Sequence, residues 1–174
     1  IIEHATTHKA LEVLYGYGAS RIHGNPIQNF FKSVWLSTNN SKAVRNRLKL
    51  VKREIEQKMV QLASEGKPIK IVSIASGSSR AIGESIDRVR LTNDPRLSVI
   101  FVDKNHEAIS YSKELTINHK YRANFEWIHD TAGNFFRIHA IGKTFNIIEM
   151  VGLIDYFDDE KAVAIFLQIF RVLD

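Results

Sequence analysis

The stretch KIVSIASGSSRAIGE, residues 70–84, decides the fold of this chain. It opens with an apolar run rich in β-branched residues at 71–74, which predicts a strand buried on both faces. Small residues follow at 75–79 and allow the backbone to turn tightly and to approach a ligand closely. Ile82 and Ile86 then recur at helical spacing, which predicts a helix packed back on the sheet. A strand, a small-residue turn and a helix form the opening unit of a nucleotide-type α/β site.

Length and composition place the chain among globular proteins. Its 174 residues are enough for one domain with a sizeable core, and 44% hydrophobic and 25% charged residues are ordinary for that class. No apolar run approaches the roughly 20 residues that span a membrane, and there is no secretory signal pattern. The absence of cysteine excludes disulfides and thiolate metal sites, and it fits a cytoplasmic protein.

Charge is unevenly distributed along the chain. Residues 1–68 carry 11 Lys and Arg against 5 Asp and Glu, whereas residues 69–174 carry 13 against 14. A basic segment such as the predicted helix at 42–58 can bind nucleic acid, anionic lipid or an acidic substrate. We favour the simpler interpretation of a solvated basic helix, so nucleic acid is not the preferred partner.

Apolar periodicity and turn residues predict the order of the elements. In the N-terminal part, helices are expected at 3–15, at 28–36 and from 44 to 62. From residue 69 strands alternate with helices. The predicted strands are 71–74, 97–102, 124–129 and 145–150, and the predicted helices start near 82, near 105, within 131–143 and at Asp158. In the last helix we expect the buried face to consist of Val163, Phe166, Leu167, Phe170 and Val172.

The alternation predicts a parallel sheet flanked by helices, and therefore two parts of the chain. Residues 1–68 form an N-terminal helical segment, and residues 69–174 form the α/β domain. The sequence starts at Ile1 rather than Met and stops at Asp174 directly after a helix, where such a sheet normally continues. We therefore expect a fragment of a longer protein that lacks the C-terminal strands.

Acidic residues follow three of the predicted strands. Asp103 ends the second strand, 26 residues after Gly77, where an acid can accept hydrogen bonds from both hydroxyls of a ribose. Alternatively, Asp103 only interacts with the dipole of the next helix. Asp130, beside Thr131, can accept a bond from an adenine amino group, or it is a loop acid without a ligand. Glu149 ends the fourth strand and either borders the same crevice or is buried and paired.

Residues 69–174 resemble the class I S-adenosylmethionine-dependent methyltransferases. The first motif of that family is an apolar strand ending in an acid, then one residue, then Gly-x-Gly-x-Gly. Ser73 stands here in place of the acid, and Ala75, Gly77 and Ser79 stand in place of the three glycines. The remaining positions that carry the resemblance are Asp103, Asp130, the run EMVG at 149–152 and the run LIDYF at 153–157.

The resemblance implies a Rossmann-like α/β fold and an enzyme that transfers a methyl group from S-adenosylmethionine. The acceptor would be a small molecule, a lipid or RNA, and small-molecule or lipid acceptors are preferred. Asn-Pro-Pro-Tyr, the signature of amino-group methylation on bases, does not follow the fourth strand. The cofactor-binding residues would be Ala75, Ser76, Gly77, Ser78, Asp103, Lys104, Asp130, Thr131, Glu149, Met150 and Gly152. If the acceptor must lose a proton, the candidate bases are His23, Asp155 and Tyr156.

One alternative is a short-chain dehydrogenase that binds NAD(P). The run SGSSRAIG, residues 76–83, is similar to the Thr-Gly-x-x-x-Gly-x-Gly turn of that family. That family places this strand near the start of the chain, whereas about 68 residues precede it here. Its Tyr-x-x-x-Lys pair is also missing, since Tyr111 and Tyr121 are followed four residues later by Leu115 and Phe125.

A second alternative is a non-catalytic adenosine-binding module, because the first motif keeps only one of its three glycines. Other catalytic signals are weak. His4 and His8 have the spacing of metal ligands on a helix, but they lie in a terminal segment, and we predict no metal site. Ser78 and Ser79 lack the Gly-x-Ser-x-Gly elbow of serine hydrolases.

Overall fold

The structure of this chain is a computed structural model that describes residues 8–15, 34, 36–118 and 124–174. The chain forms two compact units, residues 1–54 and residues 55–174. The boundary lies inside a long helix, whereas the sequence placed the change of character at residue 68. The last turns of this helix therefore belong to the second unit.

The first unit contains α2 (His8–Leu14) and the first turns of α4 (Asn39–Ser64). Thr38 starts α4, because its Oγ1 accepts a hydrogen bond from Ser41 N at 3.3 Å. The predicted helix at 44–62 is thus confirmed and extended at both ends. Most of the helix predicted at 28–36 lies outside the described residues.

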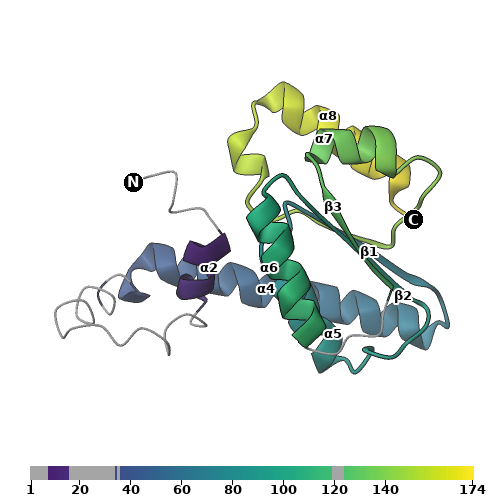
Figure 1. The fold of residues 1–174 in the computed structure, drawn as a ribbon, viewed down its shortest axis with the longest axis horizontal. Helices are drawn as coiled ribbons and strands as arrows, with labels where there is room; N and C mark the ends of the chain where they lie inside the picture. The colour runs from purple at the N-terminus through teal and green to yellow at the C-terminus, as the bar shows by residue number, and fades with distance from the viewer. Residues whose placement is uncertain (1–7, 16–33, 35, 119–123) are drawn as a thin grey trace. The chain divides into compact units, whose positions relative to one another are not determined.

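The second unit is built on a four-stranded parallel sheet with the order β3-β2-β1-β4 (Figure 1). The strands are β1 (Ile69–Ile74), β2 (Leu97–Asp103), β3 (Asn124–His129) and β4 (Ile147–Glu149). All four predicted strands are confirmed, although β4 is shorter than the predicted 145–150. The parallel arrangement brings the carboxyl ends of β1, β2 and β3 to one edge of the sheet.

Helices cover both faces of this sheet (Figure 1). One face carries α5 (Arg80–Arg88), α6 (His106–Asn118) and the last turns of α4. The other face carries α7 (Ala132–Asn134), the π-helix η2 (Phe135–His139) and α8 (Asp159–Val172). A short 3-10 helix, η3 (Ile154–Tyr156), precedes α8. Of the helices that the structure describes, none combines the length and hydropathy that crossing a bilayer requires.

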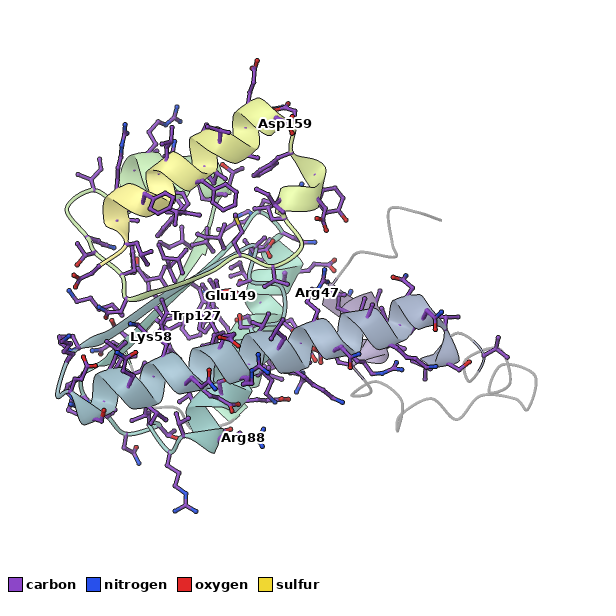
Figure 2. All side chains as sticks on the ribbon, turned by 180° about the vertical axis from the view of Figure 1, so that it is seen from behind. Arg47, Lys58, Arg88, Trp127, Glu149 and Asp159 are labelled. Atoms are coloured by element: carbon purple, nitrogen blue, oxygen red, sulfur yellow. The ribbon has the colours of Figure 1, made fainter. Side chains whose placement is uncertain are left out.

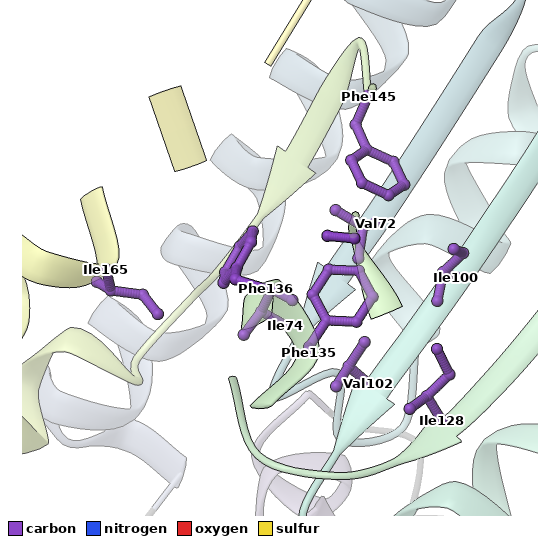
Figure 3. Packing of buried hydrophobic residues seen from close by; sticks show 10 residues of the cluster. Val72, Ile74, Ile100, Val102, Ile128, Phe135, Phe136, Phe145 and Ile165 are labelled. Atoms are coloured by element: carbon purple, nitrogen blue, oxygen red, sulfur yellow. The ribbon is translucent and has the colours of Figure 1, made fainter. Parts of the chain in front are cut away.

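The core between the sheet and η2 is formed by one hydrophobic cluster (Figure 3). Alternate residues of β1, β2 and β3 face the aromatic rings of η2, because successive side chains of a strand point to opposite faces. Burying each large apolar side chain contributes about 1.5–3 kcal/mol. The members labelled in Figure 3 are Val72, Ile74, Ile100, Val102, Ile128, Phe135, Phe136, Phe145 and Ile165.

The last helix turns a different face to the core from the one that the sequence predicted. Ile165 is buried, and Ile169 and Val172 pack against the cluster. The other four residues of the predicted face are exposed, with relative accessibilities of 58% for Val163, 46% for Phe166, 55% for Leu167 and 73% for Phe170. The prediction was wrong because α8 carries two apolar stripes at helical spacing, and only one of them reaches the sheet.

Candidate cofactor site

The bend after β1 has a backbone in which φ alternates in sign. Ala75, Gly77 and Ser79 have φ values of 55°, 55° and 59°, and Ser76 and Ser78 between them do not have positive φ. Ser79 N donates a hydrogen bond to the carbonyl of Ser76 at 2.8 Å, which closes the bend. The bend therefore has a glycine-like path although only Gly77 is a glycine.

The bend is joined directly to the end of β2. Gly77 N donates a hydrogen bond to Asp103 Oδ2 at 2.9 Å, and Ser76 N donates to the carbonyl of Val102 at 3.0 Å. Asp103 Oδ1 accepts from Asn105 N at 2.8 Å, so the carboxylate is fixed through both of its oxygens. Each oxygen keeps further lone-pair capacity, because a carboxylate offers about four acceptor positions. Two residues 26 positions apart, which the sequence predicted to share a site, thus lie in contact.

Asp130 lies at the neighbouring strand end and is held by four groups. Its N–H donates to the Asp103 carbonyl at 3.1 Å. Its Oδ1 accepts from Asn134 Nδ2 at 2.9 Å and from Thr131 N at 2.7 Å, and its Oδ2 lies 3.2 Å from His139 Nε2. The bond from Asn134, then that from Thr131, and also His139, hold the pKa of Asp130 below its ordinary value. The sequence did not point to Asn134 or His139, which follow Asp130 by four and by nine residues.

Two other predicted residues lie beside these strand ends. Ser78 is buried within the bend. Lys104 follows Asp103, and its carbonyl lies 3.0 Å from His129 Nε2, which connects the loop after β2 to the end of β3. The structure thus gathers the predicted residues of the first three strands at one edge of the sheet.

Glu149 on β4 lies opposite Ser73 on β1, the position at which the family motif has an acid. Ser73 is buried, and its Oγ donates a hydrogen bond to Glu149 Oε2. Glu149, labelled in Figure 2, is only partly buried. The expected pairing is therefore confirmed without full burial, and the expectation that Glu149 borders the crevice stays a prediction.

The segment after β4 contains the remaining predicted residues. Met150 packs against the hydrophobic cluster, and Gly152 has φ 79°. Asp155 and Tyr156 belong to η3, and both are exposed. His23 lies outside the described residues.

A groove of about 750 Å³ lies apart from the bend, between η2 and the end of α8. Three basic side chains border it, those of Arg137, Lys143 and Arg171. Thr131 is the one predicted cofactor residue in its lining, so the groove is not the site that the bend and Asp103 form. The remaining lining residues are Gly133, Asn134, Phe136, Ala140, Ile141, Gly142, Thr144, Gln168 and Val172.

One family model and several solved structures are similar to this chain. A family model described as "putative methyltransferase" matches residues 8–171, across both units. No curated protein matches the sequence. Similar solved structures include the plantazolicin methyltransferase BpumL in complex with a pentazolic desmethylPZN analogue and SAH, at 20% identity and TM-score 0.55, covering 96% of this chain and 56% of that one.

Two further structures show the same fold. The plantazolicin methyltransferase BamL, in complex with a triazolic desmethylPZN analogue and SAH, has 19% identity and TM-score 0.52, over 93% of this chain and 55% of that one. The apo form of a mycolic acid cyclopropane synthase has 12% identity and TM-score 0.50, over 79% and 45%. The predicted Rossmann-like α/β fold is confirmed, and the chain spans about half the length of these proteins.

Proposed function

We propose, starting from the fact that this chain belongs to the family of putative methyltransferases, that it transfers a methyl group from S-adenosylmethionine to a small-molecule or lipid acceptor. The observation that carries the proposal is the hydrogen bond from Gly77 N to Asp103 Oδ2. It joins a small-residue bend with a carboxylate suited to a ribose at one edge of a parallel sheet.

The residues present fit such a ligand. The N–H groups of Ser76, Gly77 and Ser79 already donate within the protein, so the bend would meet a ligand through its small side chains and the close approach that Gly77 allows. The Oγ of Ser76 is buried and has no partner among the residues that the structure describes, and a bound ligand would satisfy it. At the start of α5, Ser79 does not cap the helix with its side chain, which leaves the first N–H groups of the helix without that partner.

Each carboxylate of the site has a distinct proposed role. Asp103 would hold the two ribose hydroxyls with the lone pairs that Gly77 and Asn105 leave available. Asp130 would accept a bond from the adenine amino group. Its lowered pKa keeps it ionised, and thus an acceptor only, at neutral pH. Ser78, Lys104, Thr131, Glu149, Met150 and Gly152 remain proposed as residues that border the cofactor.

When bound, S-adenosylmethionine supplies an electrophilic methyl group, whose bond to sulfur breaks with the electron pair staying on sulfur while the acceptor atom bonds to the carbon. The contribution of this chain is to hold donor and acceptor in line and to exclude water. A base is required only where the acceptor atom carries a proton. Asp155 and Tyr156 are the proposed candidates because they follow β4 in η3, and His23 is a third candidate from the sequence.

The proposed acceptor and location are supported by similar structures, by the extent of the family match and by composition. The structures of BpumL and BamL hold desmethylPZN analogues, which is consistent with an acceptor other than nucleic acid. We propose that residues 1–68 help to cover the cofactor or to bind the acceptor, since the family match includes both units. The absence of cysteine supports a cytoplasmic location.

Ligand-induced thermal shifts test the proposal. S-adenosylhomocysteine is expected to raise the melting temperature of the wild-type protein, and NAD is not, because binding to the native state alone stabilises it. Asp103→Ala should abolish the shift, since the ribose hydroxyls lose their acceptor. Asp159→Ala, which removes an exposed carboxylate from α8, is the matched control and should keep the shift.

The possible outcomes separate the hypotheses. A shift with NAD and none with S-adenosylhomocysteine would favour the dehydrogenase. A shift with S-adenosylhomocysteine that Asp103→Ala leaves unchanged would remove Asp103 from the ribose site. No shift with either ligand would contradict the proposed use of S-adenosylmethionine.

A further inference from the structure

Ser79 lies at the start of α5 but does not behave as a capping serine. A serine at this position normally has extended backbone angles, and its hydroxyl accepts a bond from an N–H group in the first helical turn. Ser79 instead has φ 59° and ψ 13°, and its side chain makes no capping bond. Its Oγ lies 2.5 Å from Ser112 Oγ in α6, and both residues are buried.

Ser112 is itself held firmly in place. Its Oγ accepts a hydrogen bond from Trp127 Nε1 at 3.0 Å, and its carbonyl accepts one from Thr116 Oγ1 at 2.6 Å. Trp127, labelled in Figure 2, is stacked on the buried ring of Phe101, with centroids 5.8 Å apart and an interplanar angle of 28°. Because indole N–H groups only donate, the chain of bonds starts at Trp127 on β3 and reaches the bend through α6.

This chain of bonds opposes the intrinsic preference of Ser79. A residue with a Cβ is disfavoured in the left-handed region by an amount similar to what one buried hydrogen bond contributes. If Ser79 changed to extended angles, its hydroxyl would leave Ser112 and become available to cap α5. The alternation of φ in the bend would then end at Gly77, and the path of the backbone from the bend into α5 would change.

We propose that Ser112 and Trp127 are positioning residues that hold Ser79 in a glycine-like conformation, and so replace the third glycine that the bend lacks. The proposal rests on the proposed role of residues 75–79 in binding the methyl donor. Neither Ser112 nor Trp127 follows from the motif, since the contact joins three elements that are separate in the sequence. Residues 79 and 112 are therefore coupled, because the hydroxyl of Ser112 is needed only when residue 79 has a side chain.

A double-mutant cycle measures this coupling. The four proteins are the wild type, Ser112→Ala, Ser79→Gly and the double variant, and calorimetry gives their affinities for S-adenosylhomocysteine. Ser112→Ala should weaken binding about 5- to 10-fold, the effect of one lost hydrogen bond. Ser79→Gly gives the reference affinity of the second background, and there Ser112→Ala should change the affinity by less than about 2-fold, because glycine adopts positive φ without support.

Two controls distinguish positioning from a general loss of stability. Ser110→Ala removes an exposed hydroxyl from the same helix and should leave the affinity unchanged. Trp127→Phe keeps a ring against Phe101 but removes the N–H donor, and its effect should be smaller than that of Ser112→Ala. A structural role alone would lower the melting temperature of Ser112→Ala without changing its affinity, and Ser79→Gly would not restore anything.

Amide hydrogen exchange without ligand tests the same coupling independently of the proposed function. Exchange at residues 76–79 should be faster in Ser112→Ala than in the wild type and slow again in the double variant. If the wild type bound no S-adenosylhomocysteine but showed this exchange pattern, the proposed function would fail and the positioning role would stand. If exchange and affinity were the same in the wild type and in Ser112→Ala, the positioning role would be overturned.

Discussion

α5 and α8 both follow a strand of the same sheet, yet they begin in opposite ways. α8 starts at Asp158, which has an extended φ of −70° and ψ of 166° and whose Oδ1 accepts from Lys161 N at 2.8 Å. α5 starts at Ser79, which is left-handed and turns its hydroxyl to another helix. One start is closed by its own side chain. The other has no capping bond from its own side chain.

The two helices also differ in how they meet the sheet. α5 has a single apolar stripe, and Ile82 and Ile86 are buried as the sequence predicted. α8 has two stripes, and the one with more aromatic residues is exposed. α8 thus begins where the sequence predicted but buries a different face, whereas α5 buries the predicted face and begins at a residue for which the sequence made no prediction.

The largest expected effect on stability comes from truncating a buried residue of α5, and an exposed residue of α8 serves as the comparison. Ile86→Ala should lower the free energy of unfolding by about 2–5 kcal/mol, because it leaves a cavity in a fully buried position. Leu167→Ala removes a similar side chain from the exposed stripe and should stay within about 0.5 kcal/mol of the wild type. Urea unfolding measures both. Equal losses would mean that the stripe on α8 is covered in the protein in solution.

Substitution of alanine by glycine should have a smaller effect on the free energy of unfolding, with opposite signs in the bend and in α8. Ala75→Gly in the bend should raise the free energy of unfolding by up to about 1 kcal/mol, because alanine at φ 55° is disfavoured and glycine is not. Ala164→Gly, at an exposed position inside α8, should lower it by about 1 kcal/mol through loss of helix propensity. The same urea experiment measures both variants. Destabilisation by Ala75→Gly would show that the bend is not strained.

The smallest expected effect concerns the cap of α8. Hydrogen bonds from the Lys161 side chain and amide hold the pKa of Asp158 below its ordinary value. The resulting stabilisation is present above the unfolded value of about 4 and is lost as pH falls through the lower folded pKa. Asp158→Asn keeps a capping oxygen but does not titrate. Its melting temperature should be slightly below that of the wild type at pH 7, and the difference should disappear at pH 2 to 3; a constant difference would contradict this assignment.

Much of the fold was predictable because local patterns and tertiary structure agree in it. The four strands are short apolar runs bounded by turn residues, and buried parallel strands need no other signal. β4 is shorter than predicted, because Phe145 pairs with Leu173 in an isolated bridge rather than with β1. The π-helical geometry of η2 was not predicted, since the sequence pattern of Phe135 and Phe136 is compatible with any helical form.

The site was predictable to the extent that parallel strands bring their carboxyl ends together. Asp103 and Asp130 were proposed as cofactor residues from their place after a strand, and the structure places both at the same edge. The partners that orient them, Asn134 and His139 above all, carry no motif. Asn134 lies in α7 and His139 in η2, and both reach Asp130 only once these helical turns have formed.

The sequence by itself determined which segments are buried, that the sheet is parallel, and that a small-residue bend and an acid one strand away meet at its edge, because burial and strand order follow from short-range patterns. Only the tertiary structure decided the conformation of the bend. A serine and an alanine occupy left-handed backbone there, and Ser79 is held by a hydroxyl and an indole from two other elements. The physical reason is that a local preference can be overridden by a buried hydrogen bond of equal strength, and no sequence pattern records that bond.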